Sequence, residues 1–208
     1  VSLRAVAVGG VFAGHPLAWP VLGYDHTLAA MTRDQMWAYF QRRYAPDNMM
    51  LIVAGNVAPS EIVEQAEACC GSWEPVGPAP PRIAPPVHSG TDVLPIDRFK
   101  QQVVALTFPS IASTDPRIET ASAAATILGG DNSRFFWNIV QKGLAPRAGA
   151  QHLDYTDCGV MILSAACQPD RCEEVLAAIR TEAGRMCEDH VSQHEVDRVK
   201  NKRRTSLA

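Results

Sequence analysis

The stretch that decides the fold reads LGGDNSRFF, residues 128–136, and is followed after one short helix by GLA, residues 143–145. The glycine pair ends one helix and the polar turn begins another, with Arg134 in its first turn. Such a loop leaves backbone N–H groups free to meet a docked group, and a guanidinium beside them can hold a carbonyl or carboxylate. The candidate substrate-binding residues are Gly129, Gly130, Ser133 and Arg134.

The same loop has a simpler interpretation that stays open. Glycine pairs are weak signals, and these two can merely permit a tight corner between consecutive helices. In that case the loop has a structural role and binds nothing.

The segments around the loop alternate between strand pairs and helix pairs. The expected strands are 91–96 (weak, because Pro95 interrupts it), 101–108, 147–155 and 159–167. The expected helices are one from Asp115–Pro116 to Leu128, one over 133–142, one capped by Asp170 with Glu173 and one capped by Ser192 with Glu195. This order predicts an α+β fold, in which an antiparallel or mixed sheet is covered on one face by helices.

The first part of the chain predicts helix, strand and helix. Thr32 and Gln35 form a capping box that opens a helix as far as Tyr44. Residues 49–54 are an unbroken apolar run, which is typical of a strand buried on both faces. Pro59 then begins a second helix.

Prolines crowd residues 74–90, where neither a helix nor a central strand can persist. This composition predicts an extended linker between two domains. The expected organisation is a first domain over 1–73, the linker over 74–90 and a second domain over 91–208.

Composition excludes several function classes. Apolar residues make up 47% of the 208-residue chain, and its net charge is −3 with a pI near 6.1. These values give no electrostatic case for binding nucleic acid, and no apolar run reaches the roughly 20 residues of a membrane span. No targeting segment is recognisable, so the compartment stays unknown. The six cysteines fit small buried apolar residues in a reducing compartment, with Cys69–Cys70 as a less favoured redox pair.

The chain offers no convincing catalytic motif of its own. His190 and His194 have a ligand-like spacing, but Ser192 lies between them as a helix cap, so their rings would not share one helical face. Neither H-E-x-x-H nor its inverse occurs, and no G-x-S-x-G marks a serine hydrolase. We therefore expect no catalytic residue and no metal ligand within these residues.

Several longer segments of the chain are informative when they are taken together and in order. They are GHPL at 14–17 with PVLG at 20–23, YAPDNM at 44–49 with LIVAGNV at 51–57, residues 99–109, the glycine-rich loop with GLA, and YTDCG at 155–159. In this order they resemble the pitrilysin/insulinase family of zinc metallopeptidases, which includes the mitochondrial processing peptidase. The resemblance covers nearly the whole chain.

The resemblance implies repeats of antiparallel sheet with helices, of which this chain holds the end of one and most of the next. Two or four repeats close around a chamber. The family's zinc site, an H-x-x-E-H helix with a distant glutamate, would lie before Val1. Zinc would thus serve the full-length protein, activating a water molecule with glutamate as base. The chain alone would bind no zinc and be inactive, supplying chamber wall and peptide-substrate contacts.

One position departs from the family pattern. Many members carry tyrosine directly after Gly-Leu-Ala, where it holds substrate together with the loop arginine, but this chain has Pro146. Some members are paired unlike subunits, and the departure favours the zinc-bearing one, so we expect a homo- or heterodimer within the family. The alternatives are a non-catalytic scaffold or assembly subunit of the same fold and, third, an independent peptide-binding module.

Overall fold

The computed structural model describes residues 3–78, 81–96 and 100–207. Contacts divide the chain into two units. Val1–Pro20 and Ala84–Ala208 form one, which we call the sheet unit, and Val21–Ile83 form the other, the helical unit. None of the helices in the described ranges is both long and apolar enough to cross a bilayer.

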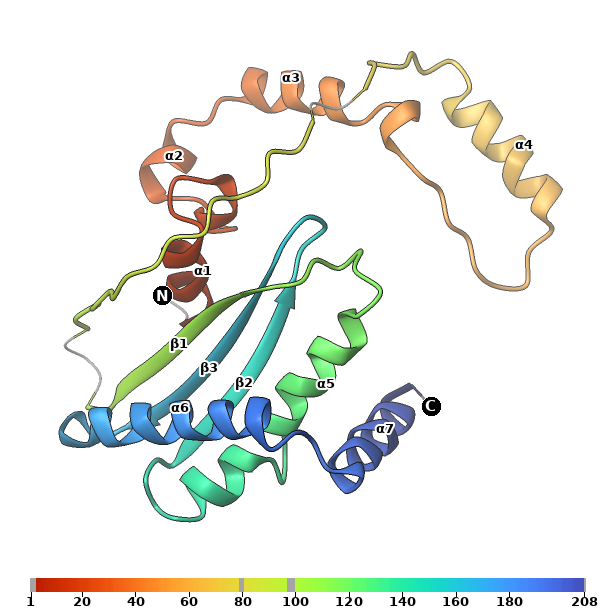
Figure 1. Cartoon of the computed structure of the whole chain (residues 1–208). Helices are drawn as coiled ribbons and strands as arrows, with labels where there is room; N and C mark the ends of the chain where they lie inside the picture. The colour runs from red at the N-terminus through yellow and green to blue at the C-terminus, as the bar shows by residue number, and fades with distance from the viewer. Residues whose placement is uncertain (1–2, 79–80, 97–99, 208) are drawn as a thin grey trace. The chain divides into compact units, whose positions relative to one another are not determined.

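The sheet has three strands, β1 (Gln102–Ser110), β2 (Arg147–Asp154) and β3 (Gly159–Cys167). They pair antiparallel in the order β1-β3-β2, so β3 is central (Figure 1). In this register Leu163 lies opposite Leu106 on one side and Ala150 on the other. The strands expected over 101–108, 147–155 and 159–167 are confirmed, as is the turn between the last two.

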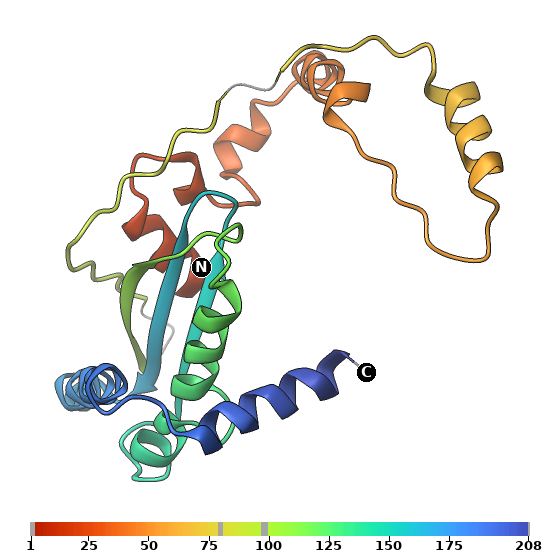
Figure 2. The ribbon, with the colours of Figure 1, turned by 45° about the vertical axis from the view of Figure 1, so that its right-hand side comes forward.

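Helices cover both faces of the sheet (Figures 1 and 2), so the expectation of cover on one face is wrong. On one face lie α5 (Ile118–Gly129), η3 (Phe136–Val140, a π-helix) and α6 (Cys172–Glu188), which follows the 3₁₀ turn η4 (Pro169–Arg171). Their core includes the fully buried side chains of Phe135, Ile139, Leu163, Val175 and Ile179. α7 (Gln193–Leu207) follows α6 and contacts α5. The α+β class and the antiparallel sheet are therefore confirmed.

The opposite face carries α1 (Leu3–Val11), followed by the short helix η1 (Pro16–Ala18). A second core joins Val8, Val11 and Phe12 to side chains of β2 and β3. The beginning of the chain thus packs on the sheet, whereas the sequence grouped it with residues as far as 73. No local signal could show this, because the contacts join residues more than a hundred positions apart.

The helical unit contains α2 (Asp25–Ala29), α3 (Arg33–Arg43), η2 (Pro46–Asn48) and α4 (Pro59–Cys70). The capping box of α3 is confirmed: Gln35 N–H donates to Thr32 Oγ1, and Thr32 N–H donates to Gln35 Oε1. The strand expected over 49–54 is wrong, since these residues are extended but unpaired and exposed. A lone apolar segment cannot become a strand without a partner, and the described part of this unit offers none.

Three further expectations fail. The helix expected to be capped by Asp170 begins at Cys172, because residues 169–171 form the turn η4, and its N-cap Arg171 makes no side-chain cap hydrogen bond. Residues 91–96 form no strand, because Pro95 removes a donor and no neighbour pairs with them. The helix expected from Asp115–Pro116 begins instead at Ile118, because the Asp115 carboxylate accepts from the backbone and side chain of Arg117 and closes a turn. The described residues of 74–90 contain neither helix nor strand, as their prolines predict, while 79–80 and Phe99 lie outside the described ranges.

Candidate functional site

The glycine pair lies where α5 passes over β2. A Cβ on Gly129 would come within 1.8 Å of the backbone nitrogen of Ala150, so only glycine lets the helix end approach the strand this closely. A Cβ on Gly130 would stand 2.7 Å from the carbonyl oxygen of Thr126. Both candidate residues therefore take part in packing.

Ser133 starts the next helical segment. Its side chain is buried, and its hydroxyl accepts the N–H of Phe136 at 3.2 Å. Asn132 before it has a positive φ of 52°, which turns the chain sharply into this segment. Gly143 ends the segment, as expected, with a φ of 69°.

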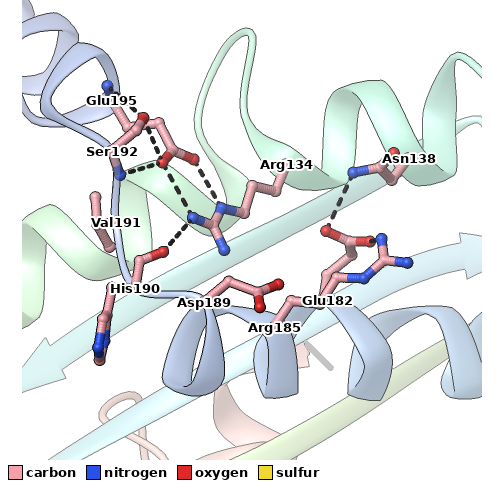
Figure 3. A pocket seen from close by; sticks show the side chains of 9 residues that line it. All are labelled: Arg134, Asn138, Glu182, Arg185, Asp189, His190, Val191, Ser192 and Glu195. Atoms are coloured by element: carbon pink, nitrogen blue, oxygen red, sulfur yellow. Dashed lines mark hydrogen bonds and ion pairs between the residues drawn. The ribbon is translucent and has the colours of Figure 1, made fainter.

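The guanidinium of Arg134 is held by Glu195, which lies 61 residues further along the chain (Figure 3). Nε donates to Oε1 at 2.7 Å and Nη2 donates to Oε2 at 3.0 Å, so the pair is bidentate. Nη2 also donates to the carbonyl of His190 at 2.9 Å. Only 15% of the Arg134 side chain and 17% of the Glu195 side chain are exposed.

The charge of Glu195 is strongly favoured in this setting. The hydrogen bond from Arg134 lowers the pKa of Glu195 to about 2, assisted by the N–H and hydroxyl of Ser192. The same contact raises the pKa of Arg134 above its usual value. Ser192 and Glu195 also form the predicted capping box of α7, so one carboxylate both starts this helix and fixes the arginine.

One side of α7 continues along the glycine-rich loop. Arg198 donates to the carbonyl of Asn132, and Lys202 Nζ donates to Asp131 at 2.7 Å. With Glu195 these residues are spaced three and four positions apart, which places them on one helical face. The loop is therefore bound along its length by α7.

A cleft of about 400 Å³ opens beside Arg134, between η3, the end of α6 and the turn into α7 (Figure 3). Glu182 lies in its wall, is only 5% exposed, and accepts from Asn138 at 3.1 Å and from Arg185 at 2.8 Å. Arg134 Nη1 has no hydrogen-bond partner among the described residues. The cleft thus offers one fixed, unsatisfied cationic donor.

The described ranges contain no group of three or more His, Cys, Asp or Glu side chains able to hold a metal ion. His190 and His194 stand on either side of the Ser192 cap, and His190 has a φ of 63°, outside helical geometry. Since zinc needs three or four such ligands, these residues do not fit a zinc site.

The sequence identified Arg134 but missed its partners. Glu195 was recognised as a capping residue, and nothing local connects a cap to an arginine 61 positions earlier. Asn138 and Glu182 resemble ordinary helix-surface residues in the sequence, and only the packing of η3 against α6 joins them.

A protein-family model, described as the peptidase M16 inactive domain, matches residues 30–203. The chain belongs to the peptidase M16 family. An uncharacterized zinc protease of Streptomyces coelicolor is 32% identical over 196 residues, which cover 88% of this chain and 41% of the relative. The chain spans about half the length of the curated M16 relatives it matches.

Solved structures show the same fold. A protease from Helicobacter pylori superposes with a TM-score of 0.82 at 20% identity, covering 98% of this chain and 51% of that protein. A chain of complex III from Candida albicans gives a TM-score of 0.85 at 17% identity, with 98% and 51% covered. The same fold is thus found both in a protease and in a chain of complex III.

Proposed function

We propose that this chain is the non-catalytic part of a zinc-dependent M16 metalloendopeptidase, in which it forms chamber wall and substrate contacts. The observation that carries the proposal is the match to the M16 inactive domain in a chain whose described residues lack a zinc ligand set. The names of relatives, zinc proteases about twice as long, support zinc in the whole protein.

In this proposal Arg134 is the substrate contact of the glycine-rich loop. Gly129 and Gly130 place the loop against β2, Ser133 starts the segment that carries the arginine, and Glu195 fixes two of the three guanidinium nitrogens. The third, Nη1, is left to donate to a peptide carbonyl or carboxylate entering the cleft. Because the guanidinium is already ordered, little conformational entropy is lost on binding.

The test is peptide binding by fluorescence anisotropy, with a labelled unstructured peptide as probe. Arg134→Ala should weaken binding about tenfold, because one charged hydrogen bond is lost. Arg117→Ala is the matched control, since Arg117 pairs with Asp115 at 2.8 Å and does not line the cleft. Equal affinities for both variants, with unchanged circular dichroism, would remove Arg134 from the substrate site.

The second candidate is a non-catalytic scaffold or assembly subunit. It is favoured by the internal role of each loop residue: Gly129 packs on β2, Ser133 caps a helix and Arg134 is paired within the chain. An H-x-x-E-H motif in the rest of the protein, with zinc-dependent hydrolysis by the whole protein, would select the enzyme, and their absence would select the scaffold.

Association with a second subunit of the family is part of the same proposal. It is supported by the helical unit, where many large apolar side chains are exposed, including Met50 at 83% and Ile52 at 79%. Exposed apolar surface on this scale is typical of an interface. Light scattering of the whole protein should give the mass of a homodimer, or of a heterodimer when its partner is co-purified, and a monomer at all concentrations would refute this part.

A further inference from the structure

Two cysteines meet where β3 passes into α6. Cys167 is the last residue of β3 and Cys172 the first of α6, with only Gln168 and the turn η4 between them. Their Sγ atoms lie 3.5 Å apart, and both thiols are free. An S–S bond of about 2.05 Å would need the sulfur atoms to approach by about 1.5 Å.

The two thiols differ in access. Cys167 is fully buried in the sheet core, while Cys172 is partly exposed and its Sγ also lies 3.6 Å from the carbonyl oxygen of Gln168. The turn between them is anchored, because Arg171 donates to the carbonyl of Gly143 at 2.7 Å and pairs with Glu174 at 3.0 Å. The fold therefore holds one accessible and one protected thiol side by side.

We propose that Cys167 and Cys172 form a thiol–disulfide pair, which a low-molecular-weight disulfide such as oxidised glutathione converts to an intrachain bond between β3 and α6. The Cys172 thiolate attacks one glutathione sulfur, forms a mixed disulfide and releases one glutathione thiolate. The Cys167 thiolate then attacks the Cys172 sulfur and releases the second. Both cysteines are oxidised, glutathione is reduced, and two protons pass to the released glutathione or to solvent.

The surroundings of Cys167 make the second step, its attack on the Cys172 sulfur, depend on pH. Burial raises the pKa of Cys167 to about 11, with the Cys172 thiol and Asp170 acting in the same direction and Arg171 opposing them. Because only the thiolate attacks, ring closure should become faster as the pH rises toward that value. The mixed disulfide on Cys172 is therefore the intermediate that accumulates near neutral pH.

The other cysteines provide comparators within the chain. Cys69 and Cys70 are neighbours in α4, but successive side chains of a helix point about 100° apart. Cys187 is exposed near the end of α6, and Cys158 lies in the turn before β3. Adjacency in the sequence alone would favour Cys69–Cys70, whereas proximity of the sulfur atoms favours Cys167–Cys172.

The experiment is a disulfide map of the purified protein after oxidised glutathione, with free thiols blocked before digestion. Trypsin cleaves after Arg171, so peptides 148–171 and 172–180 separate when the pair is reduced and stay linked when it is oxidised. We expect that link, placed at Cys167 rather than Cys158 by fragment ions and reversed by dithiothreitol. A link through Cys158, or a glutathione adduct on Cys172 that does not convert to the link when the pH is raised, would overturn the proposal.

Two variants sharpen the result. Cys172→Ser should abolish the link, while Cys167→Ser should leave glutathione attached to Cys172 as a stable adduct. Cys70→Ser is the control that should leave the link unchanged. If Cys167→Ser does not fold, the map of the unmodified protein still decides, because it depends on no substitution.

Discussion

The sheet unit and the helical unit carry the same kinds of local sequence signal, but both hydrophobic cores of the described residues lie in the sheet unit. Both contain helices with apolar stripes, and each has a helix that begins with a capping box, α3 at Thr32 and α7 at Ser192. In the sheet unit these stripes meet paired strands and build two cores. In the helical unit Ala45 is the only apolar residue buried among those described, and Trp37, Phe40 and Tyr44 stack on one another while about half exposed. Local sequence therefore specifies a helix, whereas burial requires a surface to pack against.

The largest expected difference in stability is between substitutions of two aromatic side chains, one in each unit. Phe135 is fully buried in the sheet unit, so Phe135→Ala should cost about 4 kcal/mol of unfolding free energy through the cavity it leaves. Trp37 in the helical unit is 51% exposed, and Trp37→Ala should cost less than about 1 kcal/mol. Urea unfolding followed by circular dichroism measures both, and similar losses would break the comparison.

The next effect concerns the glycine at the crossing of α5 and β2. Gly129→Ala should cost about 3 kcal/mol, because the new Cβ meets the backbone of β2 and one element must move. Gly184 in α6 has nothing within 4 Å, so Gly184→Ala should instead stabilise the protein by about 0.5 kcal/mol. A neutral Gly129→Ala variant would show that the crossing is looser than described.

These contrasts explain how much of the fold was predictable. The three strands were expected close to their observed bounds, and the caps at Thr32 and Ser192 marked the starts of α3 and α7, because these signals are local. The expected strand over 49–54 failed since an apolar run specifies burial but not the partner that provides it. The packing of α1 on the sheet was missed for a related reason: its partners in β2 and β3 lie far along the chain.

A smaller effect distinguishes a long-range ion pair from a local one. Glu195→Gln should cost about 2 kcal/mol, because it leaves Arg134 without a charged partner in a mostly buried site. Asp34 in the helical unit is the control, since its contact with Arg33 is 3.6 Å long and both side chains are almost fully exposed. Asp34→Asn should leave the unfolding midpoint unchanged. Equal effects of the two variants would mean that Glu195 contributes only surface charge.

The smallest expected effect is the pH dependence of the unfolding free energy that arises from the Arg134–Glu195 ion pair. The folded state lowers the pKa of Glu195 from 4.5 to about 2, so its contribution to stability is fully present above about pH 4.5. The contribution should decline as the pH falls through that interval, and Glu195→Gln should lack this part of the decline. Unfolding free energies measured from pH 6 down to pH 2 test it, and parallel profiles for the two proteins would contradict it.

The candidate site was predictable only in part, because its contacts also join residues that lie far apart in the sequence. Arg134 follows the glycine pair in the sequence, so a local motif identified it. Its state depends on Glu195, His190 and the cleft beside Asn138, which come together only after α6 and α7 have packed. Likewise, the cysteine pair that the sequence indicated was Cys69–Cys70, and only the structure places Cys172 beside Cys167.

The most direct test of the proposed function measures bound zinc and peptide hydrolysis in the purified 208-residue chain, with labelled-peptide binding as the check that it is folded. The account predicts peptide binding without stoichiometric zinc and without hydrolysis, because the described residues supply no metal ligand set. Zinc-dependent cleavage by this chain alone, lost on adding a chelator, would contradict it.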